Sequence, residues 1–344
     1  MNIERKILSP LAGVYSVSAL RGGGRTRVIA ASETPGGSCL LLDPEGGEPT
    51  TVWKGPGGTM SIVPASPERI LAVQQFYAGF DAARSIVAEA VAAPGSDTWT
   101  VREQLKLPFL HRLAGVTPGP NPTLLACTLC ASKANVDDWS KPGAVYRIET
   151  DPLSPDAWQP KTVIERIHRN HGFSNTTIDG ERVALVSGME GLFAITLPGD
   201  RGKAWSYSQL LTTDVSDAAA VDWDGDGTEE IVTIEPFHGH RYVFYKRSKN
   251  GAWQIIHEMP CLLGHSLWAG EVLGRKALIL GERMGEGRIQ IVFPTAGSPS
   301  EWEVLIVDRA TGGTNVTVLQ ATDRLLEFVS ANNDNNQVVL YRIT

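Results

Sequence analysis

Short apolar segments with alternating polar positions recur along the whole chain. They are rich in Val, Ile and Leu and are bounded by Gly, Pro, Asp or Asn, as in "TRVIAAS" and "EEIVTIEP". A period of two places alternate side chains on opposite faces of a strand, and helical periodicity is nearly absent. The pattern therefore predicts an all-β protein built from antiparallel strands.

The strand pattern also repeats as a larger unit, which consists of a segment rich in small residues, a turn, an apolar strand, a second turn and an alternating strand. Seven such units begin 45 to 60 residues apart, at Val14, Thr59, His111, His171, Ser216, His265 and Asn315. Units of roughly 40 to 50 residues with about four strands each are typical of β-propeller blades. The sequence thus predicts a single-domain, seven-bladed β-propeller over residues 1–344. A two-sheet sandwich, the alternative β architecture, does not explain seven recurrences.

The two ends of the chain fit this interpretation together. The last unit ends at Thr344 after three recognisable strands, whereas "IERKILS" near the N-terminus is strand-like and has no unit of its own. We expect the N-terminal strand, about residues 3–9, to complete the last blade and close the ring.

Composition narrows the partners and the compartment. A net charge of -7 without a basic cluster argues against nucleic acid or an anionic membrane as the main partner. No apolar segment approaches the roughly 20 residues of a membrane span, and the start lacks the layout of a secretory signal, so the expected compartment is the cytoplasm. Buried, reduced thiols are expected at the cysteines, rather than a disulfide framework or a zinc knuckle: Cys39, Cys127, Cys130 and Cys261.

One turn, "DWDGDGTEE", differs from the others because it alternates carboxylates with glycines. Its candidate ligands for a hard cation are the oxygens of Asp222, Asp224, Asp226, Thr228 and Glu230. It is not an EF-hand, because the bidentate glutamate would fall on Thr233 and a strand follows the loop. The turn resembles the Asp-rich loops of FG-GAP and VCBS propeller repeats, which bind calcium. We expect a structural Ca²⁺ or Mg²⁺ here; a solvated acidic turn is the alternative.

Five histidines occupy related places in the units. His111, His171 and His265 stand at the entry to a first strand, and His238 and His240 lie in the turn after a second strand, in "EPFHGHRY". In a four-stranded meander these two places lie at the same end, and the first strand of a blade is the innermost. We therefore expect the five histidines to converge on one mouth of the central channel, and the aspartate turn to lie at the opposite end.

Converging neutral imidazoles suit Zn²⁺ or another divalent transition metal, and three protein ligands leave a position open for substrate. The expected ligands are three of His171, His238, His240 and His265. Further candidates for catalysis on the same face are His111, Glu235, Glu282 and Arg283. The competing interpretation is that these polar residues only hold the loops of the rim.

The segments "DWDGDGTEEIVTIEPFHGHRYVFY" and "GHSLWAGEVLGRKALILGER" are similar to the propeller portion of the fungal aldos-2-ulose dehydratases, which also act on 1,5-anhydro-fructose. The resemblance is strongest over about residues 165–295. It implies a metal-dependent lyase that removes water from a small keto-sugar, with a zinc-like histidine site and a separate structural Ca²⁺ or Mg²⁺. Enzymes of that family carry a second propeller and a cupin-like module that these 344 residues do not contain, which leaves the substrate open.

Two other functions compete with the lyase. A noncatalytic FG-GAP or VCBS-like propeller would bind a protein or carbohydrate partner at its rim, since a fold alone does not assign a function. A propeller hydrolase of the lactonase type commonly places calcium in the central channel with oxygen ligands, and the histidine-rich mouth argues against it. A bound transition metal distinguishes the first hypothesis from both.

Overall fold

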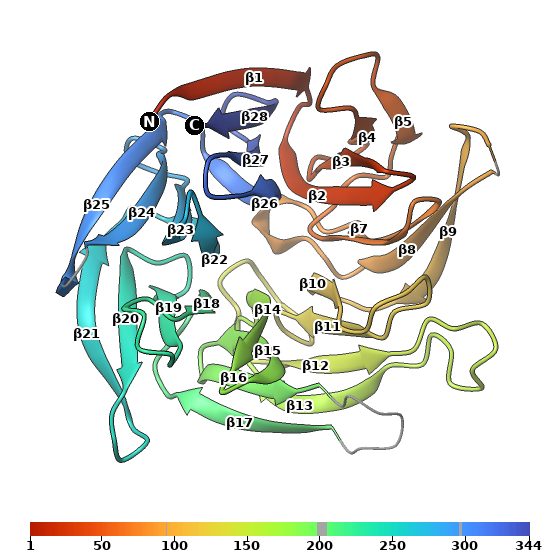
Figure 1. Ribbon diagram of the computed structural model, residues 1–344. Helices are drawn as coiled ribbons and strands as arrows, with labels where there is room; N and C mark the ends of the chain where they lie inside the picture. Colours follow the sequence, from red (N-terminus) through yellow and green to blue (C-terminus); the bar gives the residue numbers. More distant parts are fainter. Residues whose placement is uncertain (94, 198–204, 296–297) are drawn as a thin grey trace.

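The computed structural model describes residues 1–93, 95–197, 205–295 and 298–344. These residues form seven four-stranded antiparallel sheets arranged in a ring (Figure 1). The predicted seven-bladed β-propeller is confirmed.

Each blade contributes its first strand to the centre, where the first strands of neighbouring blades contact one another. The first strands are β2 (Val14–Gly22), β6 (Ile62–Ser66), β10 (Leu110–Gly115), β14 (Gly172–Ile178), β18 (Asp217–Val221), β22 (Gly264–Val272) and β26 (Gly313–Ala321). The second strands are β3 (Arg25–Ser32), β7 (Arg69–Gln74), β11 (Leu124–Thr128), β15 (Glu181–Gly188), β19 (Glu230–Glu235), β23 (Arg275–Glu282) and β27 (Leu326–Asn332).

The outer half of each blade consists of a third and a fourth strand. The third strands are β4 (Cys39–Leu42), β8 (Ile86–Ala92), β12 (Gly143–Ile148), β16 (Gly191–Thr196), β20 (Arg241–Arg247), β24 (Ile289–Thr295) and β28 (Gln337–Ile343). The fourth strands are β5 (Thr50–Trp53), β9 (Trp99–Lys106), β13 (Lys161–Ile167), β17 (Ser206–Leu211), β21 (Trp253–Pro260), β25 (Ser298–Asp308) and β1 (Ile3–Pro10). A single 3-10 turn, η1 (Ala78–Phe80), is the helical element of the described residues.

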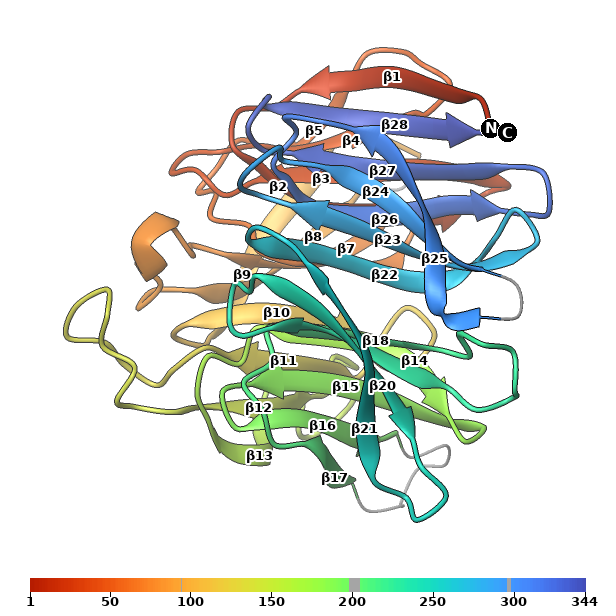
Figure 2. The ribbon, with the colours of Figure 1, turned by 90° about the vertical axis from the view of Figure 1, so that its left-hand side faces the viewer.

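The N-terminal strand is the outer strand of the seventh blade. β1 pairs antiparallel with β28, from Ile3 opposite Ile343 to Pro10 opposite Gln337. The two ends of the chain lie side by side in Figures 1 and 2, and Asn2 and Thr344 exchange two backbone hydrogen bonds. The ring is thus closed by strand pairing between the termini, as the two incomplete ends of the sequence predict.

The hydrophobic core lies between blades. Ile29 and Leu41 of the first blade, for example, belong to one buried cluster with Ile70 and Ala72 of the second. Because second and third strands are covered on both faces, they read as nearly continuous apolar runs, whereas outer strands such as β21 keep partly exposed side chains. The four cysteines are buried and free. No helix in the described ranges has the length and apolar character needed to cross a membrane.

The two ends of the fifth blade carry different chemistry. In the β18–β19 pair, Val221 lies opposite Glu230 at one end and Asp217 lies opposite Ile234 near the other. The aspartate turn follows Val221, and the histidine turn follows Glu235. They therefore lie at opposite ends of one strand, which explains how two unlike motifs are neighbours in sequence.

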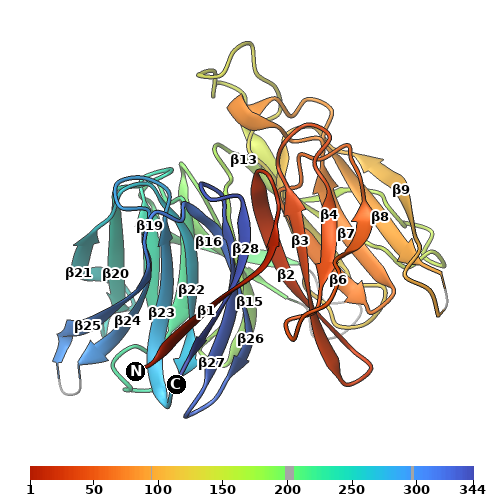
Figure 3. The same cartoon turned by 90° about the horizontal axis from the view of Figure 1, so that it is seen from above.

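Two long connections project from one face of the ring. Figures 2 and 3 show η1 (orange) and the loop between β11 and β12 (yellow-green) extending on the same side. Phe80 of η1 stacks on His238 with ring centroids 6.2 Å apart, and Trp139 of the β11–β12 loop meets Phe80 edge-on at 5.0 Å, which places both connections at the histidine end of the channel.

Candidate metal centre

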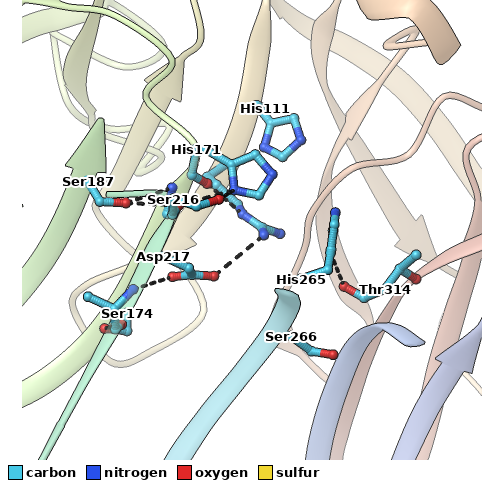
Figure 4. Close-up of polar contacts among 12 residues, drawn as sticks. His111, His171, Ser174, Ser187, Ser216, Asp217, His265, Ser266 and Thr314 are labelled. Atoms are coloured by element: carbon cyan, nitrogen blue, oxygen red, sulfur yellow. Dashed lines mark hydrogen bonds and ion pairs between the residues drawn. The ribbon is translucent and has the colours of Figure 1, made fainter. Parts of the chain in front are cut away.

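Four histidines from four blades gather at one end of the channel. The ring centroids of His171 and His111 are 4.5 Å apart, those of His171 and His238 are 5.0 Å apart, and those of His171 and His265 are 5.4 Å apart. One potential ligand atom each from His171, His238 and His265 lies within 4.8 Å of the other two. Figure 4 shows His111, His171 and His265 facing the same space. We call these four residues the histidine cluster.

A tight backbone turn directs each of these side chains inward. The residue two positions before each first-strand histidine has a left-handed conformation, with φ of 58° at Phe109, 51° at Arg169 and 53° at Leu263. His238 itself has a φ of 52°. Such values are uncommon for residues other than glycine. These backbone positions are therefore strained in the conformation that orients the histidine side chains.

Backbone carbonyl groups fix two of the imidazole tautomers. Nδ1 of His265 lies 2.8 Å from the carbonyl oxygen of Thr314, and Nδ1 of His171 lies 3.2 Å from that of Ser216 (Figure 4). A carbonyl oxygen only accepts hydrogen bonds, so Nδ1 carries the proton and Nε2 keeps its lone pair. Nε2 of His171 is buried and has no hydrogen-bond partner in the described part of the protein. Histidines that bind a metal usually donate their other ring N–H to a carbonyl or carboxylate oxygen in this way.

Burial keeps the histidine cluster neutral. It lowers the pKa of His111, His171 and His265 well below the ordinary value, and lowers the pKa of His238 to about 4. The neighbouring imidazoles and the guanidinium of Arg112 add to the effect. A metal needs deprotonated ligands, so the cluster is ready to bind one at neutral pH without releasing protons.

A tyrosine completes the cluster and was not expected from the sequence. The Tyr15 hydroxyl lies 3.2 Å from Nε2 of His265 and 3.4 Å from Nε2 of His111. Burial raises the pKa of Tyr15 to about 12, so it keeps its proton. The repeat could have pointed to Tyr15. Val14–Ser16 of the first unit aligns with Gly264–Ser266 of the sixth, so Tyr15 occupies the position of His265.

The side chain of Arg283 lies at the edge of the cluster. Its charge contributes to the low pKa values of His238 and His265. Its Nη2 donates to Oδ1 of Asn333 at 3.1 Å and lies 3.8 Å from the Glu33 carboxylate. Arg283 is thus the expected arginine of the rim, held by two partners from other blades.

The two glutamates predicted as acid–base residues are bound within their own sheets. Glu235 accepts a hydrogen bond from the Tyr245 hydroxyl at 2.8 Å and pairs with Arg241 at 3.4 Å. Glu282 pairs with Arg288 at 3.1 Å. Both carboxylates are about 1% exposed, and buried carboxylates need such partners. Their oxygens are thus engaged by neighbouring strands, and a catalytic role for the two glutamates stays a prediction.

His240 is also outside the cluster. It is exposed, whereas His238, two residues earlier, turns inward. The left-handed φ of His238 separates the two side chains of the "HGH" turn. Of the four predicted ligands, His171, His238 and His265 come together, whereas His240 does not join them.

Aromatic and cationic side chains surround His238 at the mouth. Phe237 stacks on His238 with ring centroids 4.1 Å apart, and Trp139 from the β11–β12 loop meets Phe237 edge-on at 5.5 Å. The ammonium of Lys133 lies 3.3 Å from the centre of the Trp139 ring, and Arg169 lies 5.4 Å from that of Phe237. The β11–β12 loop, the turn after β19 and the β13–β14 connection therefore form an apolar wall with positive charge beside the cluster.

Comparison with known proteins leaves the chemistry to be argued from these residues. No family model matches the chain, and no curated protein matches it. The structure itself establishes the propeller fold.

The aspartate turn has the expected carboxylate cluster and a cation of its own. Asp222, Asp224 and Asp226 each offer an oxygen within 4.8 Å of the others. The ammonium of Lys246 on β20 lies 2.6 Å from Asp224, 2.8 Å from Asp226 and 2.8 Å from Glu230. Thr228 donates its backbone N–H to Asp226 at 2.9 Å. A divalent cation would therefore compete with Lys246 for the same oxygens.

Replacing Lys246 with methionine is expected to lower the free energy of unfolding by about 2 kcal/mol, since the buried Glu230 carboxylate would lose its cation. Ca²⁺ should stabilise this variant more than the parent, in which the ammonium competes. Urea unfolding with and without Ca²⁺ measures both effects. Lys276→Met is the control: it removes only the exposed pair with Glu271 and should cost less than about 1 kcal/mol. Equal stabilisation of parent and Lys246→Met by Ca²⁺ would count against competition.

Acid should destabilise the metal-free protein through the histidine cluster. An unfolded imidazole binds a proton near pH 6.5, whereas folded His238 stays neutral down to a pKa of about 4. Between these values the unfolded state holds more protons, so stability falls as the pH falls, by about 3 kcal/mol for His238 alone. From pH 7 to 5 the His238→Gln variant should lose about 2 kcal/mol less than the parent in urea unfolding with a chelator. Equal losses would show that His238 is not held neutral.

Proposed function

We propose that the protein is a metal-dependent lyase that removes water from a small keto-sugar at the histidine cluster. One observation carries the proposal: among the residues that the structure describes, Nε2 of His171 is buried without a partner, and a ligand atom from each of His238 and His265 lies within 4.8 Å. A lone pair that is buried and unused costs free energy unless something binds it. A divalent metal ion would satisfy that lone pair, and it would take the place of the Tyr15 hydroxyl at Nε2 of His265.

The donor set fits Zn²⁺ or another divalent transition metal. His171, His238 and His265 would hold it, because they are neutral and because backbone carbonyl groups orient two of the three rings. Three protein ligands leave a coordination position for substrate. When bound, such a metal supplies Lewis acidity, which polarises a carbonyl group and acidifies the neighbouring C–H bond.

His111 and Tyr15 supply the acid–base groups that elimination needs. The base has to take a proton from carbon, and the acid has to protonate the departing hydroxyl group. His111 is neutral and is not needed as a ligand, so its imidazole can take the proton from carbon. The Tyr15 hydroxyl keeps its proton and lies 3.4 Å from Nε2 of His111, so it can donate to the leaving oxygen. Arg283 at the edge can orient substrate oxygens.

Two features support a small carbohydrate as the substrate. The segments that carry the resemblance to the aldos-2-ulose dehydratases include His238 and His265 of the cluster. The aromatic wall of Trp139 and Phe237 beside His238 offers a flat apolar surface of the kind on which a sugar ring packs. Both favour a small carbohydrate over a protein partner at this mouth.

The test is turnover of 1,5-anhydro-D-fructose by zinc-loaded protein, followed as the ultraviolet absorbance of the conjugated enone product. We expect absorbance to rise with the loaded protein and not after removal of metal with a chelator, and to return when zinc is added back. Stoichiometric metal without turnover of this or related keto-sugars would favour a binding propeller instead. Turnover that is insensitive to the chelator would contradict the proposed mechanism.

A further inference from the structure

A cavity of about 320 Å³ lies along the central channel next to the histidine cluster. We call it the channel cavity. Its wall includes Ser16, Arg112, Asp217, His265, Trp268 and Asn315. His265 belongs both to this wall and to the cluster, which places the cavity directly beside the cluster. The volume is at the lower end of the range for small-molecule sites.

Arg112 is a buried guanidinium with unused hydrogen-bond donors. The residue is 9% exposed, and its Nε donates to the carbonyl oxygen of His171 at 2.9 Å. Its nearest carboxylate, Asp217, is 3.8 Å from Nη2, which is too far for a hydrogen bond. Within the described residues neither terminal nitrogen has a hydrogen-bond partner, although guanidinium carries five N–H donors. These donors face the channel cavity, which Arg112 lines.

The remaining wall suits a polyhydroxylated ligand. The hydroxyl groups of Ser16, Ser61 and Ser266 each donate to a backbone carbonyl group of the neighbouring blade. Their protons are therefore committed, and their oxygens remain free to accept hydrogen bonds from ligand hydroxyl groups. The cavity therefore offers the guanidinium of Arg112 to bind an anion. The serine oxygens around it can accept hydrogen bonds from ligand hydroxyl groups.

We propose that the channel cavity binds the carboxylate of a small acidic sugar against Arg112, with the rest of the ligand extending to the histidine cluster. This inference rests on the proposed lyase function and narrows its substrate class to keto-sugars that also carry a carboxylate. A planar carboxylate matches the paired N–H groups of a guanidinium, and this bidentate pairing is stronger than the loose contact with Asp217. Asp217 competes with the ligand for Arg112 and so weakens binding.

The inference can be tested by calorimetric titration of the full chain with D-gluconate and with D-glucitol, which has CH₂OH in place of the carboxylate. We expect gluconate to bind at least 10-fold more tightly than glucitol. Arg112→Met should abolish this preference. Asp217→Asn, which retains an oxygen to accept the Ala218 backbone N–H, should bind gluconate more tightly than the parent does.

Using both variants, Asp217→Asn and Arg112→Met, prevents a folding defect from being mistaken for a loss of ligand binding. A gain in affinity in Asp217→Asn cannot come from a damaged fold, and a purely structural ion pair would give no gain. Equal affinities for the two ligands in the parent, a preference that persists in Arg112→Met, or no gain in Asp217→Asn would each overturn the inference. The enone assay on the same zinc-loaded protein separates the two claims, because turnover tests the lyase and the gluconate preference tests Arg112.

Discussion

Replacing His171 with alanine is expected to weaken transition-metal binding by more than about 100-fold, since loss of a mere outer-shell partner already costs about 10- to 100-fold. His171 is the best ligand to remove, because its Nε2 has no other partner in the described residues and its ring contacts the other three histidines. The measurement is competitive titration of zinc against a chromophoric chelator.

His240→Ala is the matched control for this variant. His240 lies in the same blade as His238 but is exposed, so its removal should leave zinc affinity within about 2-fold of the parent. Equal loss of zinc in both variants would mean that His240 is a ligand together with the cluster. Unchanged affinity in both would remove the cluster as a metal site.

Replacing His111 with asparagine should lower kcat by about 10²- to 10⁴-fold with zinc still bound, as expected for loss of a general base. The ring of His111 lies beside that of His171. His111 is not one of the three residues whose ligand atoms converge. The measurement is the enone assay on zinc-loaded variant protein, with metal content determined on the same sample.

His257→Asn provides the control for that loss. His257 lies on the outer strand β21, where it packs against Trp302 with ring centroids 3.6 Å apart, and should leave kcat unchanged. A His111 variant that retains full turnover would exclude His111 as the base. A variant that loses its zinc would instead make His111 a fourth ligand.

The fold could be predicted from the sequence because each blade is a local unit with a recurring pattern. Alternation identifies the strands, and the recurrence of entry segments at 45 to 60 residues identifies the blades. The same logic places His111, His171 and His265 at one end of the channel, because equivalent positions in repeats occupy equivalent places around a ring.

The misplaced residues depend on information that the pattern does not carry. Alternation gives the face of a strand, but not which partner a buried carboxylate finds, so Glu235 and Glu282 looked free although Arg241 and Arg288 hold them. The choice between the two histidines of "HGH" depends on one backbone conformation at His238.

Tyr15 and Lys246 also belong to the two sites, and the sequence pattern did not reveal them, for different reasons. Tyr15 stands at a histidine-equivalent place but differs in residue type, so a search for histidines passes over it. Lys246 reaches the aspartate turn from β20, 20 residues or more beyond Asp226 and Asp224, and a cross-strand contact of this kind is not visible in a local motif.

The central claim is that three imidazoles of the cluster hold a transition metal. Zinc K-edge X-ray absorption on protein loaded with one equivalent of zinc tests it most directly. The account predicts four ligands at about 2.0–2.1 Å with the multiple scattering of three imidazole rings. A shell of oxygen ligands without imidazole scattering would place the metal in a carboxylate site such as the aspartate turn, and would contradict the claim.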